Sequence, residues 1–400
     1  MSPSSLSVES EPFLYQRDAR YFALLGAGLE TAGAAELKAL GANDIRPGYR
    51  GLHFTANTRT LYGILYGARL FSRVLAPLIL FDCHSAKYLY RRVNEFPWER
   101  ILTLHQTFAV DAVTANSAIR HSRYAALSLK DAVVDRFRAR TGKRPNVDAD
   151  APDIPIHLYI HNNRAVISVD LAGDSLHKRG YRKRSVEAPM QETVAAGIIH
   201  ATGWRGDRPL IDPFCGSGTL LCEAWMVACR IPAGYLRTGY AFQRLPDFDG
   251  ALWDSVKAEF DGCICAPADL RVEGYDVDPE SVAAARTNLG LLPHGERVAV
   301  ACAPFATLPG WNNAVLVTNP PYGVRLGDRD EAGTLLKQFG DFLKQHCAGS
   351  EAHIYFGDAT LTKALGLKPS RKQPLKSGGL DGCLCRYELF AGPADRRGRE

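Results

Sequence analysis

The sequence predicts an α/β protein in which a mostly parallel sheet, with helices on both faces, follows smaller α/β units. Three observations support this. The chain has 400 residues, more than one typical core, so two or three domains are expected. From Leu210 onward, apolar strand-like runs alternate with helical segments, which is typical of a parallel sheet. The composition, 46% hydrophobic and 23% charged, is that of a globular protein.

The first half of the chain is expected to form the smaller units. Residues 1–17 are polar and Ser-rich, which predicts disorder. Beyond them, alternating apolar runs predict strands, and apolar residues at helical spacing predict helices. In chain order these are a strand at 21–25, a helix at 30–40, a strand at 50–55, a helix at 58–70, a strand at 73–81, a helix at 87–100, a strand at 108–114, a helix at 122–140, and strands at 154–160 and 164–171.

In the second half, a helix is expected to begin at Pro189 and Glu192 and to run to about His200. Proline suits a first helical turn, and an acid there complements the helix dipole. Further elements follow from apolar runs and turn residues. They are strands ending at about 212, 275 and 318 and a helix at 279–289.

Several classes of protein are disfavoured by composition. The longest apolar runs, such as 74–81, are too short to cross a bilayer, and residues 1–11 lack the apolar core of a signal peptide. We therefore expect a cytoplasmic protein without a membrane partner. Its ten cysteines then do not indicate disulfides. The pairs Cys263/Cys265 and Cys383/Cys385 alternate as in strands and lack zinc-ligand spacing, so no metal is expected.

Basic residues gather in the middle of the chain. The net charge is +5, but residues 120–184 hold fourteen Lys or Arg against seven Asp or Glu. A patch of this size suits a polyanion, although a solvated surface has the same composition. The segment 176–184 (LHKRGYRKR) is open to the same two interpretations: a solvated linker, or a segment that grips phosphate between two domains.

A tight glycine turn follows the strand that ends at Asp212. In DPFCGSGT (residues 212–219), Gly216 and Gly218 let backbone N–H groups approach a ligand at a helix N-terminus. A dinucleotide site is disfavoured because the third glycine position is Leu221. A triphosphate site is disfavoured because no lysine follows Gly218. Ligands of open α/β sheets bind at such strand ends.

The next strand ends in Asp276-Val277-Asp278-Pro279. An acid at this position can accept two ribose hydroxyl groups, and Asp276 is our choice for that role. Asp278 is expected to cap the following helix. The alternative is that both acids are caps.

The apolar run at 315–317 leads into Asn319-Pro320-Pro321-Tyr322. An amine conjugated to a purine is a poor nucleophile because its lone pair is delocalised. The Asn319 side-chain carbonyl and the Pro320 backbone carbonyl can each accept one N–H, and the two prolines stiffen the loop. Tyr322 offers a ring on which an extruded base can stack. Making such an amine more nucleophilic in this way needs no metal. The alternative interpretation is an ordinary turn.

With these motifs together, residues from about 20 to 390 resemble the RlmL family, bacterial 23S rRNA guanine-N2 methyltransferases with an RNA-binding THUMP domain. The matching segments are 144–154 (RPNVDADAPDI), 176–182 (LHKRGYR), the helix start at Pro189, Glu192 and Thr193, 212–221 (DPFCGSGTLL) and 319–326 (NPPYGVRL). The resemblance implies a ferredoxin-like piece, then THUMP, then a Rossmann-like, mostly parallel seven-stranded sheet with a late antiparallel strand.

The resemblance also implies roles for individual residues. S-adenosylmethionine is the implied cofactor, and Asn319, Pro320, Pro321 and Tyr322 are the implied catalytic residues. The cofactor-binding residues are expected to be Pro189, Glu192, Thr193, Asp212, Phe214, Gly216, Ser217, Gly218, Thr219, Asp276 and Asn319. For RNA contact we select Arg123, Lys178, Arg179 and Arg182.

The expected division of the chain follows from the same resemblance. It consists of a disordered N-terminus (1–17), a ferredoxin-like subdomain (18–82), THUMP (83–175), a basic linker (176–187), the methyltransferase domain (188–392) and a basic tail (393–400).

Two departures from the family pattern stand out. Ala303 and Pro304 occupy the place where an acid usually reads the cofactor's adenine, so backbone groups are expected to do so here. Some members are fused to a second methyltransferase; because this chain stops at Glu400, we expect that activity to be absent or to belong to a separate protein.

The expected function is methylation of a guanine N2 amine in 23S rRNA. Three alternatives stay open. A tRNA guanine-N2 methyltransferase shares every motif. A DNA adenine-N6 methyltransferase also uses Asn-Pro-Pro-Tyr, although the basic THUMP-like region favours RNA. A non-catalytic RNA-binding assembly factor would leave the pocket idle. Nothing in the sequence indicates the oligomeric state.

Overall fold

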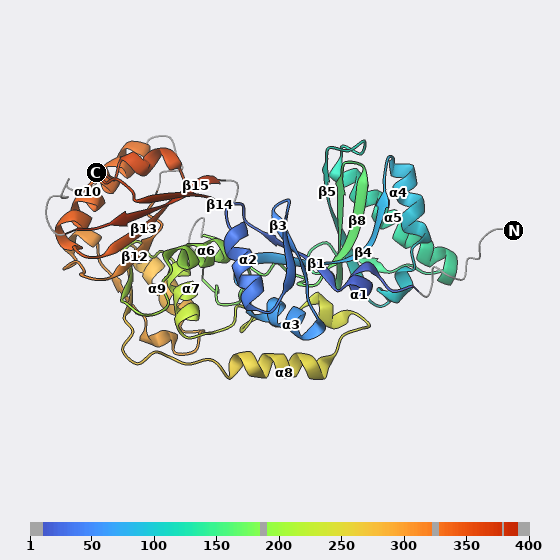
Figure 1. Cartoon of the computed structure of the whole chain (residues 1–400), viewed down its shortest axis with the longest axis horizontal. Coiled ribbons are helices and arrows are strands. Elements are labelled where there is room, and N and C mark those ends of the chain that lie inside the picture. The colour runs from blue at the N-terminus through green and yellow to red at the C-terminus, as the bar shows by residue number, and fades with distance from the viewer. Residues whose placement is uncertain (1–10, 185–189, 322–327, 378–379, 391–400) are drawn as a thin grey trace.

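The structure, a computed structural model, describes residues 11–184, 190–321, 328–377 and 380–390. It contains two sheets that lie side by side along the longest axis of the molecule (Figure 1). Each is flanked by helices, as expected of an α/β protein. Within these described ranges, no helix has the length and apolar character needed to cross a bilayer.

The first sheet has eight strands in the order β2-β3-β1-β4-β8-β7-β5-β6. Their bounds are β1 Arg20–Leu25, β2 Asn43–Gly48, β3 Gly51–Thr55, β4 Phe71–Asp82, β5 Thr107–Ala115, β6 Asn146–Val147, β7 Ile154–His161 and β8 Arg164–Asp170. The long strand β4 pairs with β1 on one side and with β8 on the other. The two expected N-terminal units therefore share one continuous sheet.

The helices of this half are α1 Leu14–Asp18, α2 Glu30–Ala39, α3 Thr58–Gly67, α4 Ala86–Glu95 and α5 Ser122–Thr141. The predicted helix at 87–100 ends early because Pro97 cannot continue it, and a short 3-10 turn, Trp98–Arg100, follows. The edge strand β2 was not predicted, since its sequence, NDIRPG, lacks apolar alternation.

Disorder through residue 17 is wrong for the residues that the structure describes. Helix α1 begins at Leu14, and the rings of Phe13 and Tyr15 are buried. The Tyr15 hydroxyl donates to Asp247 Oδ2 at 2.6 Å. Two aromatic side chains in a polar segment supply enough apolar surface to anchor it.

The second sheet has seven strands in the order β11-β10-β9-β12-β13-β15-β14. Their bounds are β9 Leu210–Asp212, β10 Val272–Asp276, β11 Ala299–Cys302, β12 Val315–Thr318, β13 Glu351–Phe356, β14 Arg371–Ser377 and β15 Leu380–Glu388. β15 runs antiparallel to both of its neighbours, β13 and β14, which confirms the predicted late antiparallel strand. The accompanying helices are α6 Glu192–Thr202, α7 Thr219–Ala228, α8 Gly250–Asp261, α9 Pro279–Leu289 and α10 Asp328–His346.

One buried apolar cluster runs through both halves of the molecule, from Phe54 and Leu158 in the first sheet to Leu210 and Val315 in the second. Helix α8, which belongs to the second half in sequence, lies beneath α3 of the first half (Figure 1). Its Trp253 ring meets the edges of two tyrosines of α3, with ring centroids 5.7 and 5.5 Å away. The two halves therefore share a core.

A buried charge network lies where the halves meet. Arg179 is 1% exposed, and its Nε donates to Glu223 Oε1 on α7 at 3.4 Å. Its Nη1 donates to the Leu176 carbonyl at 2.6 Å, and its Nη2 donates to the carbonyl of Arg69, in the loop before β4. The Tyr181 hydroxyl also donates to Glu223, at 3.0 Å. Within the segment predicted as a basic linker, the side chains of Leu176, Arg179 and Tyr181 are thus packed into the interior, whereas Lys178 is exposed.

We predict that Arg179→Met lowers the free energy of unfolding by about 3–5 kcal/mol, because it leaves the Glu223 carboxylate buried without its cation. Urea unfolding at neutral pH measures this. The matched control is Arg179→Met combined with Glu223→Leu, which removes both charges and should lose much less. A single variant as stable as the wild type would contradict the structural role of this pair.

Candidate active site

Three neighbouring strands of the second sheet end at the same edge. Strands β10, β9 and β12 are parallel and adjacent. They end at Asp212 (β9), Asp276 (β10) and Thr318 (β12), and Asn319 directly follows Thr318. The carboxyl ends of parallel strands are where open α/β sheets bind ligands. The fold therefore brings the two predicted motifs together, although a long stretch of chain separates them.

The turn after β9 leaves open space in front of its backbone. Gly216 has φ +51°, and a Cβ placed on it would meet no atom of the described residues within 4 Å. Its N–H donates to Asp276 Oδ2 at 2.9 Å, which ties the turn to β10. A Cβ on Gly218, at φ +80°, would lie 3.0 Å from the Ala285 Cβ on α9. Gly216 thus leaves room for a ligand, whereas Gly218 lets α7 pack against α9.

The two acids after β10 have different surroundings. Asp278 caps α9 by accepting from the N–H groups of Glu280 and Ser281 at 3.1 and 3.0 Å, which confirms the predicted cap. Asp276 is half-buried and accepts from the N–H groups of Gly216 and Asp278. It is not a helix cap. Its carboxylate lies beside the open turn. The sequence predicts that this carboxylate binds the ribose of the cofactor.

Asp212 is 1% exposed and bridges two strand ends. Its Oδ1 accepts from the Thr318 hydroxyl at 2.6 Å and from the Phe214 N–H at 3.2 Å. Burial raises the pKa of this carboxyl to about 7, although the two hydrogen bonds lower it in part. The acid at the end of β9 is thus connected to the residue that precedes Asn319.

The side-chain oxygen of Asn319, Oδ1, is a buried acceptor without a hydrogen-bond donor among the described residues. An unsatisfied buried acceptor costs about 1–3 kcal/mol, so such atoms mark places where a ligand donor fits. Pro320 is buried and Pro321 is exposed. Tyr322 lies outside the described residues.

The start of α6 brings two further predicted residues to this half. Glu192 and Thr193 are buried in its first turn, and Pro189 lies outside the described residues. Arg182 Nε donates to Glu192 Oε1 at 2.9 Å, and its Nη2 donates to the Met190 carbonyl at 2.8 Å. The Arg182 side chain is 17% exposed. Its guanidinium therefore serves the helix start rather than an open surface.

Sequence reasoning missed two residues that support the site. The Thr318 hydroxyl holds Asp212, as described above. On α9, Asn288 donates from Nδ2 to the Ser217 carbonyl at 3.0 Å and accepts from the Lys183 N–H at 3.0 Å. It thereby joins the glycine turn to the segment around Arg184. Neither residue belongs to a recognisable motif, because its partners are distant in sequence.

The remaining predicted residues fall into two groups. Thr219 is buried at the start of α7, and the Phe214 ring packs against Phe305, with ring centroids 5.4 Å apart. Of the residues selected for RNA, Arg123 and Lys178 are exposed. Arg179 is not, and all three of its donor nitrogens have protein partners. Its selection as an RNA contact does not fit this burial and is withdrawn.

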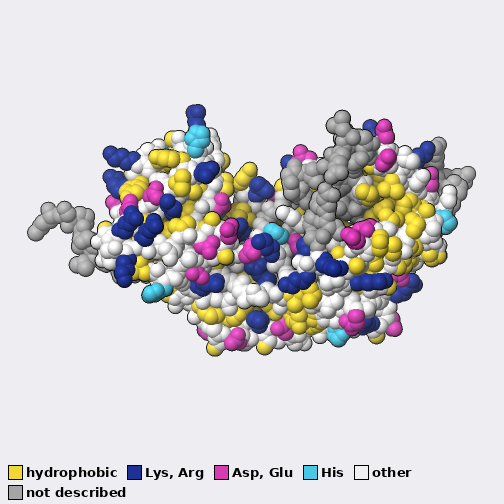
Figure 2. Space-filling view, turned by 180° about the vertical axis from the view of Figure 1, so that it is seen from behind, with side chains coloured by type: hydrophobic (Ala, Val, Ile, Leu, Met, Phe, Trp, Pro, Cys, Tyr) yellow, Lys and Arg dark blue, Asp and Glu magenta, His cyan; other side chains and the backbone are white. Residues whose placement is uncertain are grey.

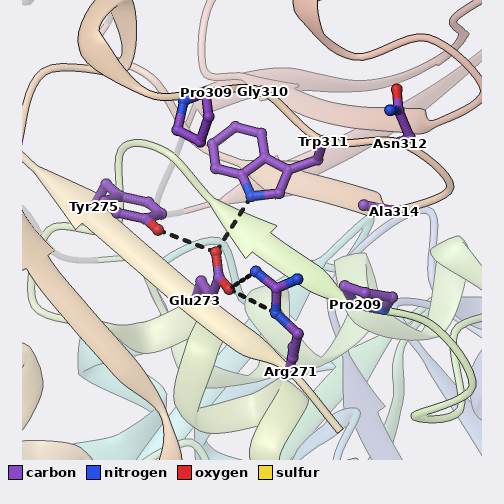
Figure 3. Close-up of a pocket in the computed structure, with 9 residues that line it drawn as sticks. All are labelled: Pro209, Arg271, Glu273, Tyr275, Pro309, Gly310, Trp311, Asn312 and Ala314. Carbon is purple, nitrogen blue, oxygen red and sulfur yellow. Dashed lines mark hydrogen bonds and ion pairs between the residues drawn. The ribbon is translucent and has the colours of Figure 1, made fainter.

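A hollow of about 340 Å³ lies at the opposite edge of the sheet, next to the amino ends of β9, β10 and β12 (Figure 3). Glu273 lies inside it and accepts from Tyr275 Oη at 3.0 Å, Trp311 Nε1 at 3.2 Å and Arg271 Nε at 3.0 Å. Burial, followed by this carboxylate, raises the pKa of Tyr275 to about 12. Because three neighbouring side chains already donate to the Glu273 carboxylate, we interpret the cluster as structural.

Family models match three consecutive parts of the chain. They are an RlmL ferredoxin-like domain at residues 20–75, a THUMP domain at 83–170 and an RMKL-like methyltransferase domain at 179–386. The last covers more than half of the chain.

The chain belongs to the RMKL-like methyltransferase family.

Individual relatives agree with this assignment. A protein of Synechocystis sp. named as a putative RNA methyltransferase (slr0064) is 38% identical over 92% of this chain and 97% of its own length. The ribosomal RNA large subunit methyltransferase K/L of Syntrophotalea carbinolica is also 38% identical over 92% of this chain, but the match spans only 53% of that protein. This methyltransferase thus covers about half the length of that relative.

A solved structure supports the predicted cofactor. SMU.472, crystallised in complex with SAH, aligns with a TM-score of 0.82 over 94% of this chain and 99% of its own, at 27% identity. SAH is the demethylated form of S-adenosylmethionine, the methyl donor predicted from the sequence. Together with the open glycine turn, this identifies the methyltransferase as one that uses S-adenosylmethionine.

The raised pKa of Asp212 predicts how stability depends on pH. The folded protein holds the proton more tightly than the unfolded chain, whose carboxyl has a pKa near 3.8. This contribution to stability is therefore complete below pH 4 and is lost as pH rises toward 7. Without cofactor, wild-type protein should lose about 2–3 kcal/mol more than Asp212→Asn between pH 5 and pH 8. Urea unfolding at both pH values measures this, and parallel curves for the two proteins would contradict it.

Replacing Thr318 tests the link between the two strand ends. Thr318→Val keeps the shape but removes the hydroxyl that Asp212 accepts from, so we expect a loss of about 1–3 kcal/mol in stability at pH 8. Thr318→Ser, which keeps the hydroxyl, is the matched control and should lose less. Equal losses for the two variants would show that packing, not the hydrogen bond, matters at this position.

Proposed function

We propose that this methyltransferase transfers a methyl group from S-adenosylmethionine to the exocyclic N2 amine of a guanine in 23S rRNA. The observation that carries the proposal is the buried Oδ1 of Asn319, which has no hydrogen-bond partner among the residues that the structure describes. It follows the strand adjacent to the open turn at Gly216. An amine is the kind of donor that this acceptor lacks.

The residues of the loop supply what an aromatic amine needs. Asn319 Oδ1 and the Pro320 carbonyl each accept one N–H, which draws the nitrogen lone pair out of conjugation with the ring. When bound, S-adenosylmethionine supplies an electrophilic methyl group on a sulfonium, which departs with the bonding electron pair as a neutral thioether. The new N–C bond leaves the nitrogen positively charged until one N–H proton passes to water.

The cofactor is assigned to the turn and to the ends of β9 and β10. Asp212 and residues 216–218 are proposed to hold its methionine part, and Asp276 its ribose. The remaining proposed cofactor contacts are Glu192, Thr193, Phe214, Thr219 and Asn319, with Pro189 assigned from the sequence alone. Tyr322, also assigned from the sequence alone, is proposed to stack on the target base. The open space before Gly216 and the half-buried Asp276 carboxylate fit a ligand of this kind.

RNA is the proposed substrate because a THUMP domain model matches residues 83–170. In the space-filling view, Lys and Arg side chains gather over the lobe that contains α4 and α5 (Figure 2). Arg123 at the start of α5 and Lys178 remain proposed phosphate contacts, since both are exposed. In the proposed division of the chain, residues 83–175 hold the RNA and residues 188–392 perform the chemistry. 23S rRNA is favoured by the name of the Syntrophotalea relative.

The test is to incubate the protein with isotopically labelled S-adenosylmethionine and 23S rRNA from a strain that lacks the enzyme. We expect label in N2-methylguanine at one position, located by nuclease digestion and mass spectrometry. The variant Asn319→Ala should bind cofactor with nearly unchanged affinity in calorimetry, because the other proposed cofactor contacts remain. It should turn over about 100–1000-fold more slowly, because a preorganised contact to the reacting group is lost.

Each other outcome overturns a specific part of the proposal. Label in tRNA but not in 23S rRNA would leave the chemistry and replace the substrate. Label in adenine would assign the loop to a different amine. A wild-type rate in Asn319→Ala would remove the proposed role of the loop, and failure to bind cofactor would indicate a non-catalytic RNA-binding protein.

A further inference from the structure

The segment between the two sheets is held as a joint from both sides. Residues 171–182 connect β8 to the second half of the chain. From one side, Arg237, in the loop after α7, donates to four backbone carbonyls of this segment. Its Nη1 reaches the carbonyls of Ser175 and Lys178 at 2.9 and 3.0 Å, and its Nη2 reaches those of Ala172 and Asp174 at 3.2 and 3.0 Å.

The side chain of Arg237 is half-buried. Arg237 also lies over the Tyr240 ring, with the guanidinium carbon 4.9 Å from the ring centroid. Each of the four carbonyls would otherwise need water or another donor. One side chain from the second half thus fixes the backbone of residues 172–178, which follow the last strand of the first sheet.

From the other side, buried cations connect the same segment to both halves. Arg179 reaches Glu223 on α7 and the Arg69 carbonyl before β4. In turn, Arg69 Nη2 donates to the carbonyls of Met226 and Ile231 at 3.0 and 2.5 Å. The N–H of Arg69 is held by Glu36 of α2 at 2.8 Å. Hence α2, β4, the connecting segment and α7 form one hydrogen-bonded unit.

This contact is unlike the usual interface between domains. Interfaces between domains of one chain are commonly polar and allow relative motion. Here the buried apolar cluster is continuous between the sheets, and α8 packs beneath α3. Moving one sheet against the other would expose apolar surface and would separate buried charges from their partners. The sheet that carries the THUMP region and the sheet that carries Asn319 are therefore held at a fixed separation.

We propose that Arg179 and Arg237 are positioning residues that set target choice in this enzyme. By fixing the RNA-contacting sheet relative to the methyl-transfer loop, they select the guanine that lies at one distance from the bound RNA element. This rests on the proposed function. In this proposal both the pocket and the joint determine specificity, although the joint touches neither the cofactor nor the reacting amine.

A reversible crosslink distinguishes a rigid joint from a hinge. A Cβ built on Gly173 would lie 3.4 Å from the Ala241 Cβ, across the joint. Disulfides join Cβ atoms about 3.5–4.5 Å apart, so Gly173→Cys with Ala241→Cys places a bond there. Gly173 has φ +78°, which strains any other residue. The reduced form of the same double variant is therefore the reference, in a background with the exposed Cys263, Cys265 and Cys302 changed to Ser.

The oxidised protein should methylate RNA at the rate of the reduced protein and at the same guanine. A large loss of activity on oxidation, restored by reductant, would overturn the proposal, because it would show that the sheets must move apart. If the wild type methylates no RNA at all, the proposed function fails instead. The joint is then judged by small-angle scattering, in which the two redox forms should have the same radius of gyration, and a more compact oxidised form would refute a rigid joint.

Loosening the joint should have the opposite effect. Arg237→Met removes all four carbonyl contacts, and Arg230→Met, an exposed arginine in the same loop, is the matched control. For Arg237→Met we expect kcat/KM on long RNA to fall about tenfold or more, as misplacement of a reacting group does, with label spreading to neighbouring guanines. Cofactor affinity should not change, and Arg237→Lys should restore part of the selectivity. A single methylated guanine at the wild-type rate in Arg237→Met, or the same spread in Arg230→Met, would overturn the proposal.

Discussion

The hydrogen bond between Thr318 and the buried Asp212 carboxylate joins the two strand ends on which the candidate active site depends. It forms because β9 and β12 are adjacent and parallel, so that their last residues meet at one edge. On one side of it lies the glycine turn, and on the other lies Asn319. Burial raises the pKa of the Asp212 carboxyl, so ionising it has a free-energy cost that a positively charged ligand would reduce.

Several buried polar side chains near this end of the sheet are paired within the protein. Glu192 is paired with Arg182, and Asn288 connects the glycine turn to the preceding segment. By contrast, Asn319 Oδ1 accepts nothing from the described residues. A buried acceptor left open at the ligand-binding end of a parallel sheet is a place where a donor of a ligand fits.

The same burial explains how the two halves of the molecule act together. Basic residues between domains are commonly assigned to nucleic acid, yet Arg179 is enclosed by Glu223 and by backbone carbonyls. Its charge is neutralised inside the protein, so it stabilises a geometry and adds nothing to the surface potential. In the proposed function, the exposed cations of the α5 region contact RNA, at a distance from the Asn319 loop that the joint maintains.

The sequence by itself determined the class of fold, the order of its parts and both motifs of the site. These are local: alternating apolar runs specify strands, Gly216 and Gly218 permit a tight turn, and two prolines stiffen the loop after Asn319. Only the tertiary structure decided that the first eight strands form one sheet, that Thr318 holds Asp212, and that Arg179 is buried. Each of these depends on residues far apart in the chain, because exposure and pairing are set by what packs against a side chain rather than by its neighbours in sequence.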